Sequence, residues 1–188
     1  MSTLRIIAGK AKGMRIQSVP GDSTRPITDR AKESLFNIIS TDTIDSSWLD
    51  CYGGTASVSI EALSRGAKSA TIIDLHPLAI DTIKRNLIHT NFSHQCDVIK
   101  MDTLAFLKRS PSNSYDYIFI APPQYKGLWE KTISIIDNNP GWIEEDGWII
   151  VQIHPMEYKS LILENFEEFD QRKYGSTLFV FYQKPILK

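Results

Sequence analysis

Four clusters of polar, glycine or proline residues each follow directly after a short apolar run. They are residues 50–57 (Asp-Cys-Tyr-Gly-Gly-Thr-Ala-Ser), 74–75 (Asp-Leu), 102–103 (Asp-Thr) and 121–125 (Ala-Pro-Pro-Gln-Tyr). In open α/β sheets, ligands bind beyond the carboxyl ends of the strands. If the apolar runs are parallel strands of one sheet, the four clusters lie at the same edge and form a single binding or catalytic site.

The first cluster contains the paired glycines Gly53 and Gly54, which permit a tight turn and a close approach of the backbone to a ligand. A helix expected from Val58 onwards would point its amino terminus at that ligand. The loop has neither a G-x-G-x-x-G pattern nor a P-loop Gly-Lys-Ser/Thr, which disfavours a nucleoside triphosphate as the ligand. Taken alone the loop is a weak signal, and an ordinary glycine turn explains it too.

Two acidic residues, Asp74 and Asp102, follow the second and third apolar runs. A carboxylate at the end of the second strand can accept hydrogen bonds from ribose hydroxyls, although Asp74 could instead cap the helix that Pro77 begins. Asp102 could bind an adenine amino group, cap the next helix, or do both. A glycine loop together with a strand-end acid is a stronger indication of a binding site than either feature alone.

The fourth cluster combines two consecutive prolines with an aromatic residue. The prolines stiffen the loop and remove two backbone donors, which leaves carbonyl acceptors exposed. Such a loop suits a flat base with an exocyclic amino group, because Tyr125 could stack on the ring while carbonyl oxygens accept from its N–H groups. Without further information, a plain strand-to-helix connection is the simpler interpretation.

The elements that must position these clusters alternate along the chain. This alternation predicts an α/β fold with a mostly parallel sheet covered on both faces, and the late strands could add an antiparallel edge. A helix over 26–40, with Thr28 as its N-cap, precedes the alternating region, and two short strands at 4–9 and 14–19 precede that helix. We therefore expect a basic extension over residues 1–44 and an α/β domain over 45–188. The expected strands are 48–51, 70–74, 97–101, 115–120, 148–153 and 178–182, and the expected helices are 58–65, 77–90, 103–109, 128–138 and 156–166.

Charge is distributed unevenly along the chain of 188 residues, whose formal net charge is only −1. Residues 1–32 carry seven Lys and Arg against two Asp, whereas residues 144–170 are strongly acidic. A basic arm on an acidic body is typical of a protein that grips phosphates at one end. A solvated basic hairpin is the alternative interpretation.

Several classes of protein are disfavoured. No apolar run approaches the roughly 20 residues needed to span a bilayer, and the first residues do not resemble a signal peptide. The two cysteines, Cys51 and Cys96, are too few for a disulfide framework and predict reduced thiols in a cytoplasmic protein. His89, His94 and Cys96 do not match a zinc spacing, so we expect no metal.

Three segments carry a resemblance to a known family. RIIAGKAKGMRI (5–16), TRPITDRAKESLFNII (24–39) and DCYGGTASVSIEALSRGA (50–67) together resemble the RsmD-type guanine-N2 methyltransferases of bacterial small-subunit ribosomal RNA. The resemblance extends from Arg5 to about Gln152. It implies a Rossmann-like S-adenosylmethionine-dependent methyltransferase fold, with S-adenosylmethionine as the cofactor. The implied substrate is small-subunit ribosomal RNA, either free or within an assembling subunit.

The resemblance also implies residue roles. The loop at 50–57 would wrap the methionine portion of the cofactor, Asp74 would hold its ribose, and Asp102 with Thr103 would flank its adenine. Residues 25–30 would close over the cofactor and help to seat the RNA. The implied cofactor-binding set is Arg25, Thr28, Asp50, Cys51, Gly53, Gly54, Thr55, Ala56, Asp74, Leu75, Asp102 and Thr103; the RNA-binding set is Arg5, Lys10, Lys12, Arg15, Arg30 and Lys126; and the catalytic set is Ala121, Pro122, Pro123, Gln124 and Tyr125.

One departure from the family pattern affects the chemistry directly. After the fourth strand the family has Asp-Pro-Pro followed by Phe or Tyr, whereas this chain has Ala121 in place of the Asp, and its Tyr125 comes one position late. Ala56 and Ser59 also stand where the family often has glycine. Loss of one electrostatic partner in a comparable oxyanion hole slows catalysis by about 10²- to 10³-fold. The carbonyl oxygens of the loop and the Gln124 side chain can still accept hydrogen bonds, so we expect a slower enzyme and not an inactive one.

The sequence thus favours an active methyltransferase with a variant acceptor loop. A non-catalytic, RNA-binding ribosome-assembly factor is one alternative, and it would bind ribosomal RNA without transferring a methyl group. A methyltransferase acting on a small molecule or a protein is another. The basic arm disfavours that reading, and a steep salt dependence of substrate binding would distinguish RNA from such substrates.

Overall fold

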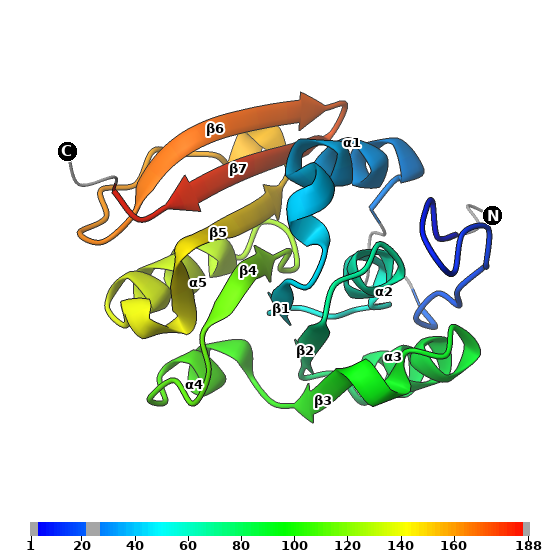
Figure 1. Cartoon of the computed structure of the whole chain (residues 1–188). Helices are drawn as coiled ribbons and strands as arrows, with labels where there is room; N and C mark the ends of the chain where they lie inside the picture. Colours follow the sequence, from blue (N-terminus) through cyan, green and yellow to red (C-terminus); the bar gives the residue numbers. More distant parts are fainter. Residues whose placement is uncertain (1–3, 22–26, 186–188) are drawn as a thin grey trace.

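The computed structural model describes residues 4–21 and 27–185, and it contains a seven-stranded sheet of order β3-β2-β1-β4-β5-β7-β6 (Figure 1). Strands β1 to β5 pair in parallel, and β7 pairs antiparallel with both β5 and β6. This arrangement confirms the expected Rossmann-like α/β fold with an antiparallel edge. The strands are β1 (Ser47–Asp50), β2 (Ser69–Asp74), β3 (Cys96–Lys100), β4 (Tyr115–Ile120), β5 (Ile143–Ile153), β6 (Glu167–Tyr174) and β7 (Thr177–Gln183).

Helices cover both faces of the sheet because its central strands are apolar on both sides. Side chains of α1, α2 and α3 share one buried cluster with one face of the sheet, and side chains of α4 and α5 share a second cluster with the other face (Figure 1). No helix in the described ranges is long and apolar enough to cross a membrane. The helices are α1 (Asp29–Ile39), α2 (Ser57–Ser64), α3 (Pro77–His89), α4 (Thr103–Leu107) and α5 (Leu128–Asp137), with short 3-10 turns η1 (Ser40–Thr43), η2 (Ser93–Gln95), η3 (Pro140–Trp142) and η4 (Pro155–Glu157).

The expected helix at 156–166 is wrong. Only the 3-10 turn η4 forms there, and the chain then runs irregularly to β6. Leu161 and Leu163 pack against the core while Ile162 between them is fully exposed, which is the alternation of an extended chain. The backbone amides of Glu164 and Asn165 donate to the buried Asp137 carboxylate, at 2.9 and 2.8 Å. These two bonds satisfy the backbone without a helix.

Strand β6 was not expected from the sequence. Its residues, EEFDQRKY, are mostly charged, and it occupies the outer edge of the sheet. A charged edge strand is protected from pairing with other chains, so its composition reflects its place at the edge and gives little sign of a strand.

The two strands expected at 4–9 and 14–19 reduce to one antiparallel bridge between Arg5 and Arg15. The amino-terminal arm, residues 4–19, is nevertheless a hairpin, since the Ile6 amide donates to the Met14 carbonyl at 2.9 Å and the Ile16 amide donates to the Leu4 carbonyl at 2.9 Å. Leu4, Ile6 and Ile16 are buried in the same cluster as α2. The arm is thus packed on the core, while the division into 1–44 and 45–188 stays a prediction about chain organisation.

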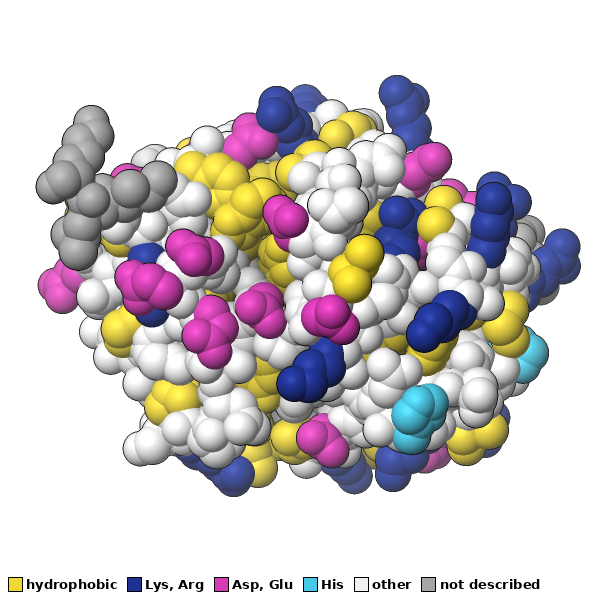
Figure 2. All heavy atoms as spheres, viewed as in Figure 1, with side chains coloured by type: hydrophobic (Ala, Val, Ile, Leu, Met, Phe, Trp, Pro, Cys, Tyr) yellow, Lys and Arg dark blue, Asp and Glu magenta, His cyan; other side chains and the backbone are white. Residues whose placement is uncertain are grey.

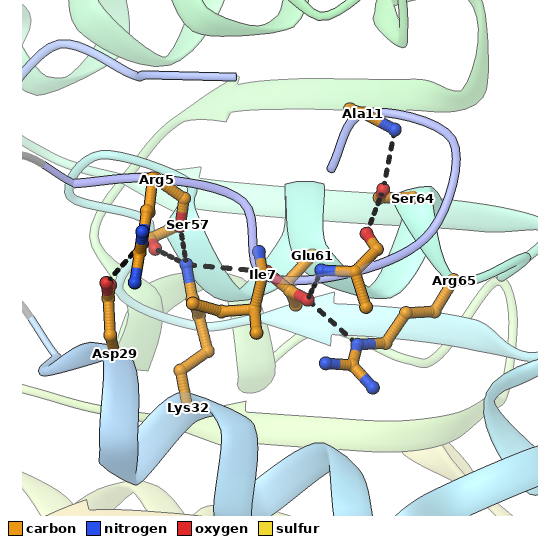
Figure 3. A network of polar contacts seen from close by, with 10 residues as sticks. Arg5, Ile7, Ala11, Asp29, Lys32, Ser57, Glu61, Ser64 and Arg65 are labelled. Carbon is orange, nitrogen blue, oxygen red and sulfur yellow. Dashed lines mark hydrogen bonds and ion pairs between the residues drawn. The ribbon is translucent and has the colours of Figure 1, made fainter. Parts of the chain in front are cut away.

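A buried carboxylate docks the arm onto α2 (Figure 3). Glu61 is completely buried and accepts from the backbone amides of Ile7 and Ala8, at 2.8 and 3.0 Å. It also accepts from the Arg65 Nε at 2.8 Å and lies 3.5 Å from the Lys32 Nζ, itself almost fully buried. Burial lowers the pKa of Lys32, and the charge of Glu61 opposes that shift. The network compensates two buried charges and ties the arm, α1 and α2 together.

Ser64 fixes the turn of the arm. Its hydroxyl donates to the Ala8 carbonyl at 2.5 Å and accepts from the Ala11 amide at 2.9 Å. Gly9 lies so close that an added Cβ would come within 1.8 Å of the Ser64 carbonyl oxygen. The arm and residues 61–65 are therefore fitted closely to one another.

Helix α1 begins where the sequence predicts. The Thr28 Oγ1 accepts from the Ala31 amide at 3.2 Å, so Thr28 is the N-cap. The first residue of the expected range, Pro26, lies outside the described residues.

Candidate cofactor and acceptor site

A cavity of about 900 Å³ opens where β1, β2 and β4 end. Its volume is in the range of small-molecule binding sites. All four clusters that follow the predicted strands contribute to its wall, as the common strand direction requires. The expected site residues that line it are Asp50, Gly53, Gly54, Thr55, Asp74, Leu75, Asp102, Thr103, Ala121, Pro122, Pro123, Gln124 and Lys126.

The glycine loop between β1 and α2 is constrained by its packing. A Cβ at Gly53 would lie 2.4 Å from the Ile72 Cγ2, so only glycine fits there. Gly54 and Ala56 both have positive φ, at 54° and 60°, which is favourable for the first and strained for the second. Ala56 is buried and immediately precedes α2. The loop thus turns sharply and exposes its backbone to the cavity.

Asp74 joins the glycine loop to the start of α3. One of its carboxylate oxygens accepts from the Gly54 amide at 2.9 Å, and the other accepts from the His76 amide at 2.8 Å. Each oxygen retains a further lone pair, so the half-buried carboxylate can still accept from ligand hydroxyls. The backbone bonds hold it in place for that purpose.

Asp102 and Thr103 form the next wall of the cavity. Asp102 is the N-cap of α4, since its carboxylate accepts from the Ala105 amide at 2.9 Å, and it remains exposed beside the cavity. The Thr103 hydroxyl donates to the Cys51 carbonyl oxygen. The capping interpretation of Asp102 is therefore confirmed, and a second role in ligand binding stays open to it.

Asp50 is the buried acid of the cavity wall. It is 2% exposed, and its carboxylate accepts from the Ser59 Oγ at 2.7 Å. The pKa of Asp50 is raised to about 6, mainly by burial and to a smaller extent by repulsion from Asp74, while the hydrogen bonds from Ser59 and the Tyr52 amide oppose the shift. A positively charged ligand would offset this burial by stabilising the ionised carboxylate.

The charges of the wall suit a cation. Asp50, Asp74 and Asp102 line the cavity, whereas Lys126 is the single Lys or Arg among the described residues that do so. A polyphosphate would meet mainly like charges, whereas a ligand bearing a sulfonium and an ammonium group would be attracted. The positively charged groups of S-adenosylmethionine therefore fit this cavity.

The acceptor loop contributes residues 121–124 to the cavity, but Tyr125 is not among the lining residues. Tyr125 has a positive φ of 60° and is 65% exposed. Its amide donates to the Glu157 Oε2 at 2.6 Å, and its ring lies 5.8 Å from that of His154. In this structure the ring stands outside the cavity, and its role in stacking stays a prediction.

Four further expected residues lie apart from the cavity wall or cannot be placed. Cys51 is buried beneath the glycine loop, Ala56 is buried at the start of α2, and Thr28 caps α1. Arg25 lies outside the described residues.

Sequence reasoning missed several residues of the wall. Val19 and Ile27, from the arm side, line the cavity, as do Phe119 and Gln152 from the sheet. Phe119 could have been found from strand alternation, because it lies two residues before Ala121 and shares its face. Gln152 is a polar residue near the end of an apolar strand, which is the same signal that identified Asp74. Ile27 belongs to the segment 25–30 that the family resemblance places over the cofactor, although it was not named as a binding residue. Val19 gave no signal, since its place depends on how the arm folds back.

One side chain links the arm to the glycine loop. Asn86, which is 1% exposed on α3, accepts from the Gln17 amide at 2.8 Å and donates to the Gln17 carbonyl at 3.0 Å. Its amide group also donates to the Thr55 carbonyl at 2.9 Å. The arm and the cavity loop therefore share an anchor.

The expected RNA-binding cations differ in whether they form an ion pair within the described residues. Arg5 forms an ion pair with Asp29 at 2.8 Å. Within residues 4–21 and 27–185, the other five make no ion pair and are exposed, namely Lys10, Lys12, Arg15, Arg30 and Lys126. Figure 2 shows Lys and Arg gathered toward the side of the molecule that carries the arm, and a group of acidic side chains on the opposite side.

Comparisons with known proteins agree with this geometry. The model of a family described as "Conserved hypothetical protein 95" matches residues 4–183. The ribosomal RNA small subunit methyltransferase D of Haemophilus influenzae is 34% identical over 184 residues, which cover 96% of this chain and 93% of the relative. The chain belongs to this methyltransferase D family.

Other members support the assignment. The methyltransferase D of a Buchnera aphidicola strain is 34% identical over 80% of this chain and 78% of its own. A solved Escherichia coli structure, the yhhF protein, superposes with a TM-score of 0.86 at 28% identity and covers 97% of this chain and 98% of that one. This methyltransferase D family member is therefore an S-adenosylmethionine-dependent methyltransferase, as the sequence resemblance implied.

Proposed function

We propose that this methyltransferase transfers a methyl group from S-adenosylmethionine to the exocyclic N2 amino group of a guanine in small-subunit ribosomal RNA, in the cytoplasm. The observation that carries the proposal is that the glycine loop, the strand-end acids and the Pro122-Pro123 loop meet in one cavity. The names of the relatives support ribosomal RNA as the substrate. The acceptor-rich loop supports a base with an amino group.

Some residues of the cavity bind the cofactor and others bind the substrate. Residues 50–55 hold the methionine portion, Asp74 accepts from the ribose hydroxyls, and Asp102 with Thr103 borders the adenine. The cofactor supplies an electrophilic methyl group on its sulfonium. The carbonyl oxygens of Ala121 and Pro122 accept from the substrate amino group and orient it.

The transfer requires no base of high strength. The amino nitrogen lone pair forms the new N–C bond while the C–S bond electrons return to sulfur, and the nitrogen then loses one proton to solvent. Holding the nitrogen and the methyl carbon about 3–3.5 Å apart in line supplies most of the acceleration. Rigidity of the loop, which the two prolines provide, is thus the property that matters.

The exposed cations bind and position the RNA. Lys10, Lys12, Arg15 and Arg30 contact phosphates from the arm and the start of α1, and Lys126 does so from the rim of the cavity. Phosphate contacts of this kind fix the position of RNA without reading its sequence. The free RNA and an assembling subunit are both compatible with this mode of binding.

A second candidate function has one observation in its favour. Ala121 replaces the acid of the family pattern, and an RNA-binding assembly factor without catalysis would tolerate that loss. Such a protein would bind small-subunit RNA and leave it unmodified.

Methyl transfer to naked small-subunit RNA and to partly assembled subunits distinguishes the two. Both substrates are prepared without prior modification, incubated with methyl-labelled S-adenosylmethionine, and the labelled nucleotide is then mapped. Label on a guanine N2 supports the proposal. Binding of cofactor and RNA without label on either substrate would overturn it in favour of the assembly factor.

A further inference from the structure

Gln152 lies near the carboxyl end of β5 and lines the cavity. Its Oε1 is shielded from solvent and has no hydrogen-bond partner in the part of the chain that the structure describes. A buried polar atom is almost always paired, and leaving one unpaired is unfavourable. The side chain lines the cavity, so a rotation of its carboxamide would bring this oxygen to a donor on a bound ligand.

The register of the sheet places this side chain next to the variant position. Phe119 pairs with Ile150 and Ile120 pairs with Val151 in the parallel β4–β5 ladder. One step further along each strand come Ala121 and Gln152. Residues two apart in a strand share a face, so Ala121 follows Phe119 and Gln152 follows Ile150 on the face that α1 covers.

The two positions are therefore complementary. The family pattern has an acid where this chain has the methyl group of Ala121, which can accept no hydrogen bond. The neighbouring strand supplies a carboxamide on the same face, in the same cavity, and its oxygen is unpaired among residues 4–21 and 27–185.

We propose that the Gln152 Oε1 accepts a hydrogen bond from the amino group that is methylated, in place of the carboxylate that position 121 lacks. This inference rests on the proposed function. One N–H of the guanine amino group points at Gln152, which leaves the nitrogen lone pair free for the methyl group. A carboxamide is a neutral acceptor and does not take the proton, so the proton leaves to water after the new N–C bond has formed.

Gln124 is the competing acceptor because it also lines the cavity. It stands on the loop, and its polar atoms are not among those that are buried without a partner in the described chain. The unsatisfied oxygen of Gln152 therefore has more to gain from a substrate donor.

The test uses the full chain with four variants and unmodified ribosomal subunits as substrate. Gln152→Leu keeps much of the side-chain volume and removes the acceptor, whereas Gln152→Glu keeps an acceptor oxygen. The double variant Gln152→Leu with Ala121→Asp restores an acceptor from the neighbouring strand. Gln171→Leu, on the exposed edge strand β6, is the matched control.

We expect Gln152→Leu to slow single-turnover methyl transfer on the order of 10²-fold, the size seen for loss of one electrostatic partner. The Kd for S-adenosylhomocysteine, measured by calorimetry, should not change. Gln171→Leu should stay near the wild-type rate. Gln152→Glu should lose less activity than Gln152→Leu because it keeps an acceptor oxygen, and the double variant should recover about tenfold or more of the loss.

Two results would overturn the inference alone, namely a wild-type rate in Gln152→Leu, or a loss that Ala121→Asp does not relieve. A wild-type protein that methylates neither RNA nor subunits would instead sink the proposed function, and this inference with it.

Discussion

Asp50 connects burial to the pH dependence of stability. Its pKa rises from 3.8 to about 6 on folding, because burial penalises the charged form. Between these values the folded protein binds more protons than the unfolded chain, so the free energy of unfolding falls as pH rises from about 4 to about 6. The whole change is on the order of 3 kcal/mol.

The prediction is that Asp50→Asn flattens this dependence. Urea unfolding between pH 4 and about pH 7 measures it, and Asp81→Asn on the exposed side of α3 is the control. If the Asn variant lost stability across this range as steeply as the wild type, Asp50 would not be its source.

Ionisation of Asp50 should also affect cofactor binding, but affinity should rise with pH where stability falls. A cationic ligand beside Asp50 favours the ionised carboxylate, so affinity for S-adenosylmethionine should rise with pH up to about 6, by at most about tenfold per pH unit. S-adenosylhomocysteine lacks the sulfonium charge and should show a shallower dependence. Calorimetric Kd values from pH 5 to about pH 8 for both ligands test this, and equal slopes would contradict it.

Individual site residues were predictable where a local rule applies. Asp50 and Asp74 end strands β1 and β2, and Asp102 follows β3, so strand direction alone brings them together. The contribution of Gln152 depends on its register against Ala121, and no local pattern specifies which strands become neighbours. The position of the Tyr125 ring depends on its positive φ and on a bond to Glu157, a residue 32 positions away in the chain.

At the scale of elements, the arm depends on α2 for its structure. Its hairpin contains one bridge, and its backbone amides at Ile7 and Ala8 are held by Glu61. Removing the charge of a buried acid leaves Lys32 and Arg65 without compensation, which typically costs about 3–5 kcal/mol.

Glu61→Gln should therefore lower the free energy of unfolding by about 3 kcal/mol. Hydrogen exchange at Ile7 and Ala8 should accelerate more than exchange in β4. The control is Glu33→Gln, which changes an exposed acid on α1. Unchanged protection at the two amides would show that the carboxylate does not hold the arm.

The elements themselves were predictable in proportion to their burial. The central strands are apolar runs, and α1 has a clear N-cap in Thr28, so both follow from sequence rules. The segment 156–166 satisfies its backbone through Asp137, a tertiary contact that periodicity does not reveal. Strand β6 is polar because it lies at an edge, and the same polarity hides it from recognition as a strand.

For the molecule as a whole, the separation of charge governs association with RNA. The basic arm and the acidic β5–β6 side lie apart, so an approaching polyanion is oriented before contact (Figure 2). Part of the positive charge counted in the sequence is not free to bind phosphate, since Lys32 is buried and the exposed Arg5 is paired with Asp29.

Binding of ribosomal RNA should weaken steeply with salt. Each of Lys10→Ala, Lys12→Ala and Arg15→Ala should lower affinity and reduce the slope of log K against log salt by up to about one. Lys108→Ala, which removes an exposed cation at the C-cap of α4, serves as the control. Slopes that do not differ between the arm variants and the control would place the RNA elsewhere.

The shared anchor at Asn86 couples the binding of RNA to the binding of the cofactor. Its amide group holds Gln17 of the arm and Thr55 of the cofactor loop at once. If bound RNA raises the affinity of the protein for S-adenosylhomocysteine by some factor, S-adenosylhomocysteine must raise the affinity for RNA by the same factor. A product complex that is stabilised in this way dissociates slowly. Release of the modified RNA, and not methyl transfer, would then limit the rate of turnover.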